Sequence, residues 1–406
     1  MSSQSGWKTL NLDECFWFQE GPGVRKWQFT DSGIKLLNVA NIEKAGTLNL
    51  SKTERHLSVD EVNNRYRHFL IDSGDLVIAS SGISFDKDGL LRTRGAFVEQ
   101  RHLPLCLNTS TIRFKARDEI SELRYLRHWL NGLEFRRQIT KLVTGSAQQN
   151  FGPSHLKAVT ISLPPLPEQR RIAAILDQTD ALRAKRREAL AQLGELQRSI
   201  FIETFGDPVA NPKAWPRVSF DEACPTRLGK MLDQKQQTGQ HLKPYLRNAN
   251  VQWFRFDLND VLEMDFEAKI REMFRLEDGD LLICEGGEPG RAAIWRGEIA
   301  ECYYQKALHR GRPNPRLATS EYLAWLLWFL AARGGLADHV TSATIAHLTG
   351  EKLKAINIPL PPLDLQCLFV QRLNEISKLR TSIETASLEL DNLFTSLQHR
   401  AFAGEL

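Results

Sequence analysis

The sequence predicts a mixed α/β (α+β) fold made by tandem duplication of one unit, in which a globular domain is followed by a long helix. A helix-forming stretch with a Leu-Pro-Pro-Leu entry occurs twice, at residues 163–205 and 360–402, and the two copies align without gaps. Shorter matches upstream of each copy follow the same order in both halves of the chain. Short apolar runs between glycine turns supply the strands of each domain.

The repeated stretch is expected to form one long helix in each copy. Its two prolines fix an extended entry, because the residue before a proline is disfavoured in the helical region. In copy one, Pro167 suits the first helical position. At 1.5 Å per residue, the roughly 39 residues from 167 to 205 would span about 58 Å.

Apolar residues in both helices recur in alternating steps of three and four, which is the pattern of a heptad seam. Thr179 and Arg186 interrupt the seam of copy one, and copy two has Ile376 and Ile383 at the same places. We predict that the helices pair as an antiparallel coiled-coil spacer, while the sequence leaves open pairing with another chain. The predicted seam residues are Ile172, Ile175, Leu182, Leu193, Leu196, Ile200, Ile376, Leu379, Ile383, Leu390, Leu393 and Leu397.

The composition is that of a soluble globular protein of two to three domains, with 406 residues, 42% hydrophobic and 25% charged. The N-terminal residues are polar, and the longest apolar run, residues 322–332, is too short to cross a bilayer. A cytoplasmic protein without membrane contact is therefore expected. The six cysteines lie far apart with no C-x-x-C pair, so neither a zinc site nor a disulfide framework is indicated.

The duplication extends upstream of the helices. A constant shift of 197 residues starts where Tyr125 matches Tyr322 and continues into the long helix. Earlier matches are Trp-x-x-apolar-x-apolar-Asp-Glu at 7–14 and 215–222, Leu-x-x-Ala-Asn-apolar at 37–42 and 246–251, and Gly-Asp-Leu-apolar-Ile at 74–78 and 279–283. The predicted segments are two globular domains, 1–150 and 207–345, each followed by a helical spacer, 151–206 and 346–406.

Within the domains, short apolar runs beside glycine turns predict strands at 76–79, 111–114, 281–284 and 292–295. Helices are predicted at 120–139 in the first domain and 320–332 in the second.

The stretch in which the two copies differ most holds basic and polar residues next to glycine turns. Arg, Lys, Gln and His in such loops suit phosphate contacts and the reading of base edges. A basic loop taken alone is more often solvated surface, but two divergent copies on a common frame suit two different half-sites. The candidate DNA-binding residues are Arg92, Arg94, Arg101, Arg113, Lys115, Arg291, Lys306, Arg310, Arg312 and Arg316.

Recognisable catalytic motifs are scarce in the sequence. No G-x-x-x-x-G-K-[ST] phosphate loop occurs, and the Asn-Pro pairs at Asn211 and Asn314 lack the second proline and the aromatic residue of an amino-methyltransferase motif. Asp265, Glu267 and Lys269 form a Glu-x-Lys cluster that suits Mg²⁺ binding, which keeps open a stand-alone DNA nuclease or modifying enzyme. A coiled-coil scaffold without DNA binding is a third interpretation. A duplicated unit without a catalytic or metal motif is most simply a recognition subunit.

The chain resembles the specificity (S) subunit of type I DNA restriction-modification systems. The similar features are the doubled Leu-Pro-Pro-Leu entry with Glu168-Gln169 in copy one, the long helix after it, the Gly-Asp-Leu-apolar-Ile runs and Pro289-Gly290-Arg291. Their order and duplication are specific, and they cover nearly the whole chain. Copy two departs from the family pattern, because Asp364-Leu365-Gln366 stands where Pro-Glu-Gln is expected.

The resemblance implies two target-recognition domains, each reading one half of a bipartite site in double-stranded DNA, with the helices setting the distance between the halves. It also implies that two methyltransferase (M) subunits bind the helices and carry the S-adenosylmethionine chemistry. Restriction (R) motor-nuclease subunits would add translocation and cleavage with ATP and Mg²⁺. No cofactor, metal or catalytic residue is expected in this chain.

Overall fold

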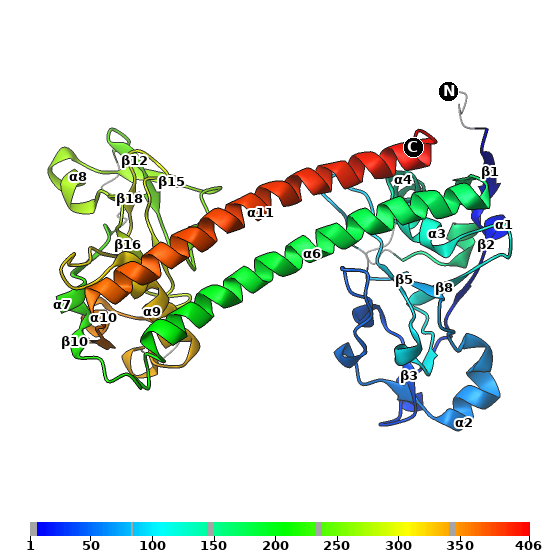
Figure 1. Cartoon of the computed structure of the whole chain (residues 1–406), viewed down its shortest axis with the longest axis horizontal. Helices are drawn as coiled ribbons and strands as arrows, with labels where there is room; N and C mark the ends of the chain where they lie inside the picture. The colour runs from blue at the N-terminus through cyan, green and yellow to red at the C-terminus, as the bar shows by residue number, and fades with distance from the viewer. Residues whose placement is uncertain (1–5, 83, 144–149, 232–237, 341–345) are drawn as a thin grey trace. The chain divides into compact units, whose positions relative to one another are not determined.

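The computed structural model describes residues 6–82, 84–143, 150–231, 238–340 and 346–406. The chain divides into two compact units: unit 1 comprises Met1–Arg187 and Thr385–Leu406, and unit 2 comprises Glu188–Glu384. The two long helices, α6 (Leu166–Phe205) and α11 (Leu363–Ala403), each contribute one part to each unit (Figure 1). The long helix predicted from residue 167 to 205 is therefore confirmed.

Unit 1 contains a four-stranded antiparallel sheet in the order β2-β8-β5-β6. Its strands are β2 (Phe16–Glu20), β8 (Thr111–Ala116), β5 (Leu76–Ala79) and β6 (Gly95–Phe97). A smaller sheet contains β4 (His56–Leu57), β3 (Ile34–Leu36) and β7 (Leu105–Cys106), and β1 (Lys8–Asn11) pairs with β9 (Thr160–Leu163) just before α6. The predicted strands at 76–79 and 111–114 are confirmed.

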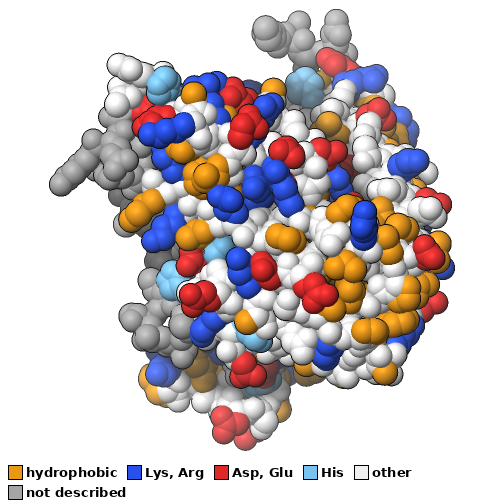
Figure 2. Space-filling view, turned by 90° about the vertical axis from the view of Figure 1, so that its left-hand side faces the viewer, with side chains coloured by type: hydrophobic (Ala, Val, Ile, Leu, Met, Phe, Trp, Pro, Cys, Tyr) orange, Lys and Arg blue, Asp and Glu red, His pale blue; other side chains and the backbone are white. Residues whose placement is uncertain are grey.

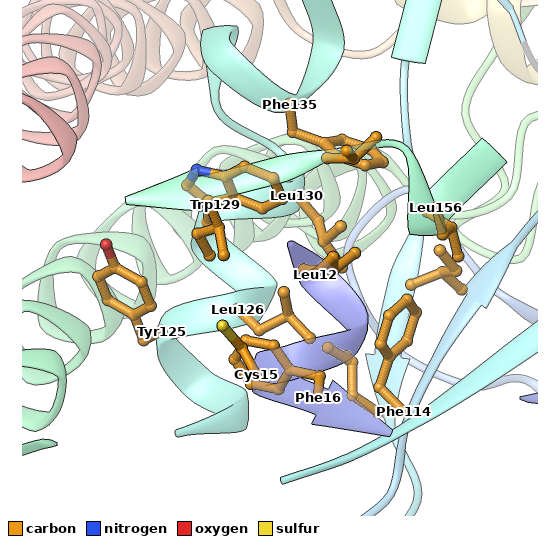
Figure 3. Close-up of a cluster of buried hydrophobic side chains, with 14 of the residues drawn as sticks. Leu12, Cys15, Phe16, Phe114, Tyr125, Leu126, Trp129, Leu130, Phe135 and Leu156 are labelled. Atoms are coloured by element: carbon orange, nitrogen blue, oxygen red, sulfur yellow. The ribbon is translucent and has the colours of Figure 1, made fainter. Parts of the chain in front are cut away.

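Short helices pack against this sheet, and the core of unit 1 lies between them, the strands and the start of α6. These helices are α1 (Leu12–Cys15), α3 (Leu123–Leu130), α4 (Leu133–Leu142) and α5 (Pro153–Lys157), while α2 (Val59–Glu61) lies beside the smaller sheet. Leu12, Phe16, Phe114, Leu126 and Trp129 are at most 2% exposed and pack together (Figure 3). The single helix predicted at 120–139 is wrong, because Gly132 is extended and separates α3 from α4.

Unit 2 repeats this plan. Its four-stranded sheet has the order β11-β19-β16-β17, with β11 (Thr226–Leu228), β19 (Leu308–Gly311), β16 (Leu281–Cys284) and β17 (Ala292–Ile294). The smaller sheet contains β15 (Leu262–Asp265), β12 (Leu242–Leu246) and β18 (Tyr303–Tyr304), β13 (Val251–Gln252) pairs with β14 (Arg255–Phe256), and β10 (Arg217–Ser219) pairs with β20 (Asn357–Pro359). The matching strand orders confirm the tandem duplication.

The helices of unit 2 are α7 (Phe220–Ala223), α8 (Ala268–Phe274), α9 (Ser320–Ala332) and α10 (Gly350–Lys354). The predicted helix at 320–332 is confirmed as α9. Its apolar run is buried on most sides of the helix, which explains why its composition is so hydrophobic. Among the described residues, no helix is long and apolar enough to cross a membrane.

Both long helices begin at the same kind of anchor. The fully buried side chain of Gln169 donates from Nε2 to the carbonyl oxygens of Pro164 (2.8 Å) and Ile120 (2.9 Å), and its Oε1 accepts the N–H of Glu122 (2.9 Å). Gln366 repeats all three bonds with Pro361, Leu317 and Thr319, each at 2.9 Å. The departure at Asp364-Leu365 in copy two therefore leaves this anchor unchanged.

The helices pair in antiparallel fashion within each unit. In unit 1, Arg171 donates to the carbonyl oxygen of Leu406 (2.7 Å), and Arg183, three turns later in α6, pairs with Asp391 (2.5 Å). In unit 2, Arg380 donates to Gln197 (3.3 Å), and the rings of Phe201 and Phe369 lie 5.6 Å apart. In both units, residue numbers increase along α6 where they decrease along the contacting part of α11 and its C-terminal end, so the helices run in opposite directions.

The buried face of the pair differs from the predicted seam at alternate positions. Ile172, Leu193 and Ile376 are buried, whereas Leu182, Leu196, Leu379 and Leu393 are 45–51% exposed. Leu176, Phe201 and Leu373 are buried instead, so the inward steps run four then three. The sequence has apolar residues at both sets of positions, and which set is buried depends on the helix and domain surfaces that pack against it. The remaining predicted seam residues are partly buried, namely Ile175, Ile200, Ile383, Leu390 and Leu397.

Candidate nucleic-acid interface

Four of the ten candidate DNA-binding residues make internal contacts in the four-stranded sheets. Arg113 in β8 is 6% exposed, and its Nη2 donates to the carbonyl oxygen of His68 and to Oε1 of Gln19, both at 2.9 Å. Its guanidinium lies 3.5 Å from the carboxylate of Asp75 and 4.9 Å from the ring centre of Trp17, and it also donates to the carbonyl oxygen of Leu70. These contacts fix the side chain inside unit 1.

Arg310 occupies the equivalent place in β19. It is 8% exposed, donates to the carbonyl oxygen of Arg275 (2.9 Å), and lies 5.6 Å from the ring centre of Tyr304. Burial lowers the pKa of the Arg310 guanidinium. Arg312 pairs with Asp280 (2.7 Å); although burial lowers the pKa of Arg312, this hydrogen bond contributes to an overall rise.

The aspartates of the repeated Gly-Asp-Leu motif are the acidic partners of three of these cations: Asp75 pairs with Arg113 and Lys115, and Asp280 pairs with Arg312. Asp75 accepts the N–H of Asp72 (3.0 Å), and Asp280 accepts the N–H of Glu277 (2.8 Å), so each closes a turn before its strand. Burial raises the pKa of Asp75 despite the opposing effects of that N–H, Lys115 and Arg113. Lys115 lies 3.8 Å from Asp75 and 2.5 Å from Asp72. The motif therefore supports an ion-pair network in each unit.

The other six candidates lie outside these two networks. Arg92, Lys306 and Arg316 are exposed, and no ion pair involves them within the part of the chain that the structure describes. Arg94 donates to the carbonyl oxygen of Gly82 (3.3 Å). Arg101 pairs with Glu99 (3.0 Å). Arg291 is only partly exposed: it pairs with Glu288 (3.2 Å) and donates to the carbonyl oxygen of Asn248 (3.0 Å).

One face of the molecule carries mixed charge. On the face shown in Figure 2, Lys and Arg side chains lie among Asp and Glu side chains, with hydrophobic side chains between them. This agrees with a net charge of only +4. A DNA-binding surface on this chain would therefore consist of local groups of cations rather than one continuous positive face.

The residues considered for nuclease chemistry have structural partners. The carboxylate of Asp265 accepts the N–H groups of Gly239 and His241, both at 2.7 Å; burial raises its pKa, but these bonds lower it overall. Glu267 and Lys269 form an exposed ion pair of 2.9 Å. Among the described residues, no group of three or more His, Cys, Asp and Glu is arranged to hold a metal ion. Nothing in this geometry favours DNA cleavage.

The comparisons with known proteins all point to one family. A family model for the type I restriction modification DNA specificity domain matches residues 4–192 and 212–390. The EcoKI specificity subunit of Escherichia coli (strain K12) is 25% identical over 303 residues, which cover 70% of this chain and 65% of that protein. The chain thus matches just under two thirds of that relative's length.

Two further matches extend over more of the chain. The putative type I restriction enzyme specificity subunit S.HindORF215P of Haemophilus influenzae is 21% identical over 371 residues, covering 90% of both proteins. A structure solved in a study of complex assembly and conformational transition of the type I R-M system aligns over 100% of both chains, with a TM-score of 0.60 and 19% identity. At that identity the structural match shows a shared fold.

Proposed function

The chain belongs to the family of type I restriction-modification DNA specificity proteins, and from this premise we propose that it is the non-catalytic subunit that selects the DNA sequence for such a complex. One observation carries the proposal: the two units share the sheet topology, the helix anchor and an ion pair between a cation and the Gly-Asp-Leu aspartate, but they differ in their basic loops. Each unit would read one half of a bipartite site in double-stranded DNA. Backbone contacts would position it, and contacts to base edges would give specificity.

The proposed contacts fall on the loops near the four-stranded sheets. Arg92, Arg94 and Arg101 would serve unit 1, and Arg291, Lys306 and Arg316 would serve unit 2. Arg113, Lys115, Arg310 and Arg312 would instead keep the sheets in shape, because they lie in or directly after β8 and β19 and their charged groups contact neighbouring parts of the same unit. The loops can then diverge without disturbing the frame that carries them.

The long helices would carry the partner subunits and set the gap between half-sites. Leu182 and Leu393 are exposed in unit 1, and their repeat equivalents Leu379 and Leu196 are exposed in unit 2. Each unit thus presents the same apolar pair, which suits two copies of one partner. We propose that two methyltransferase subunits bind there and that restriction subunits join through the complex. S-adenosylmethionine, ATP and Mg²⁺ would bind to those partner subunits. The complex would work in the cytoplasm.

An exchange of one segment of unit 2, which includes β17, β18 and β19 and the loops between them, tests whether each unit reads its half-site independently. Residues 291–315 would be replaced by the equivalent segment of another family member, while Arg310 and Arg312 are kept because they hold the sheet. The half-site read by unit 2 should change, and the other half-site and the gap should stay the same. The measurement is the set of methylated sites when the variant is co-expressed with the methyltransferase subunit. A change in both half-sites would contradict one domain per half-site.

A further inference from the structure

Unit 1 contains a pocket of about 440 Å³ whose lining carries an excess of positive charge. The charged lining residues are Lys44, Arg94, Arg127, Arg183, Arg187 and Asp180. They come from the loop before β4, the strand region at β6, helix α3 and the part of α6 that belongs to unit 1. The pocket therefore lies where the globular part of unit 1 meets the helix pair of the same unit.

Internal ion pairs fix one part of the pocket lining, here called the floor, which consists of Arg127, Asp180 and Arg183. Asp180 pairs with Arg127 (3.2 Å) and Arg183 (3.0 Å), and Arg183 also pairs with Asp391 (2.5 Å). The guanidinium of Arg183 lies 4.4 Å from the ring centre of Phe394, which fixes its plane. These two arginines are positioned by the protein before any ligand arrives.

The remaining cations are not balanced. No ion pair involves Lys44, Arg94 or Arg187 within the described ranges of the chain. The loop that carries Lys44 comes close to the floor, since Gly46 has φ +83° and a Cβ there would lie 3.0 Å from Nη2 of Arg127. Only glycine allows this approach without strain. Three cations without an ion-pair partner among the described residues thus line the same pocket as the two fixed guanidinium groups of Arg127 and Arg183.

Unit 2 provides an internal control for this arrangement. The 197-residue repeat places Ala324, Trp325 and Trp328 at the positions of Arg127, His128 and Asn131. There the ring of Phe254 stacks on Trp325 with centres 4.4 Å apart, and Trp325 contacts Trp328 at 5.9 Å. Glu384 takes the place of Arg187. Arg380 keeps the place of Arg183, whereas the other two cations are replaced, so the repeated fold forms at this junction without Arg127 and Arg187.

We propose that this pocket in unit 1 binds a phosphate group of the DNA backbone beside the half-site that unit 1 reads. The inference rests on the proposed function and adds a contact that the loops do not supply. Arg94 connects the pocket with the proposed DNA-reading loop of unit 1, because it lines the pocket and is two residues from the exposed Arg92. Guanidinium groups suit phosphate through paired N–H donors. Such a contact strengthens binding to every sequence and selects none.

The test compares DNA binding by the assembled complex with and without the unbalanced cations. The double variant Lys44→Ala/Arg187→Ala should bind both specific and non-specific DNA about ten-fold more weakly. Its plot of log affinity against log salt should become shallower by roughly 1 for each DNA phosphate that the variant no longer neutralises. The methylated sequence should not change, and neither should the thermal unfolding midpoint, since both side chains are exposed.

Lys185→Ala/Lys378→Ala is the matched control, because it removes two exposed cations from the long helices at positions that do not line the pocket. If the pocket variant loses no more DNA affinity than this control, the proposal is overturned. Titration of the complex with ATP and with inorganic phosphate, without DNA, tests the other source of phosphate. Saturable binding that the pocket variant lacks, with DNA affinity unchanged, would overturn the assignment to DNA. Neither result bears on the proposed function, because the sequence that the complex selects is measured separately by the pattern of methylated sites.

Discussion

Replacing Gln169 with leucine should lower the free energy of unfolding by roughly 3–6 kcal/mol, because three backbone groups would each lose a partner at about 1–2 kcal/mol. This is the lower part of the range for fully buried groups, since one of the three hydrogen bonds is buried and two are part-buried. Those groups are the carbonyl oxygens of Pro164 and Ile120 and the N–H of Glu122. Leucine has nearly the volume of glutamine, so the loss is one of hydrogen bonds rather than of packing. Urea unfolding of the full chain, followed by tryptophan fluorescence, measures it.

Gln178→Leu is the matched control, because Gln178 is exposed in the same helix and its replacement should change stability by no more than about 0.5 kcal/mol. Gln366→Leu should affect unit 2 as Gln169→Leu affects unit 1, since all three bonds are repeated. Equal stability of the Gln169 and Gln178 variants would show that the glutamine is not the anchor of the helix.

Arg113→Ala should destabilise unit 1 by about 3–5 kcal/mol, the range for breaking a buried ion pair from one side. The substitution leaves Asp75 buried without its nearest guanidinium, and it removes donors to the carbonyl oxygens of His68 and Leu70. Hydrogen exchange of the full chain should show weaker protection in β8 and β5, which pair with each other. The matched comparison is Arg92→Ala, whose side chain is exposed.

The two arginine variants separate a structural role from a DNA-contact role. Arg92→Ala should leave stability within about 0.5 kcal/mol of the parent and weaken DNA binding. If Arg113→Ala instead kept its stability and reduced only DNA affinity, Arg113 would be a DNA-contact residue and the structural assignment would fail. The same comparison applies to Arg310, which has the equivalent position in unit 2.

Much of the fold follows from local sequence signals. The Leu-Pro-Pro-Leu entries place the starts of α6 and α11 within three residues, because the paired prolines disfavour the helical conformation in the residue before each of them. The strand at 281–284 matches β16 because a glycine turn precedes it and all four residues are apolar. The tandem repeat then relates most of these assignments between the two halves, at a shift of 205 residues for this strand and of 197 from Tyr125 onward.

What the sequence could not provide depends on tertiary contacts. Leu182 and Leu176 are equally suitable for a helix seam, and the partner helix alone determines that Leu176 is the buried one. Arg113 looked like a surface cation, although its place between Ile112 and Phe114 in an apolar run and its match with Arg310 were available signals. The pocket at Arg127 and Arg183 was hidden because its members are far apart in the chain.

The most direct test of sequence selection is to co-express the chain with the methyltransferase subunit encoded beside it and map methylated adenines by single-molecule sequencing. Two reading units joined by helices predict a split motif, with two specific half-sites separated by a gap of fixed length and no preferred sequence. Methylation at one continuous motif, or methylation without sequence preference, would contradict the account. A stable complex that methylates nothing and shows no salt-sensitive DNA binding would contradict it as well.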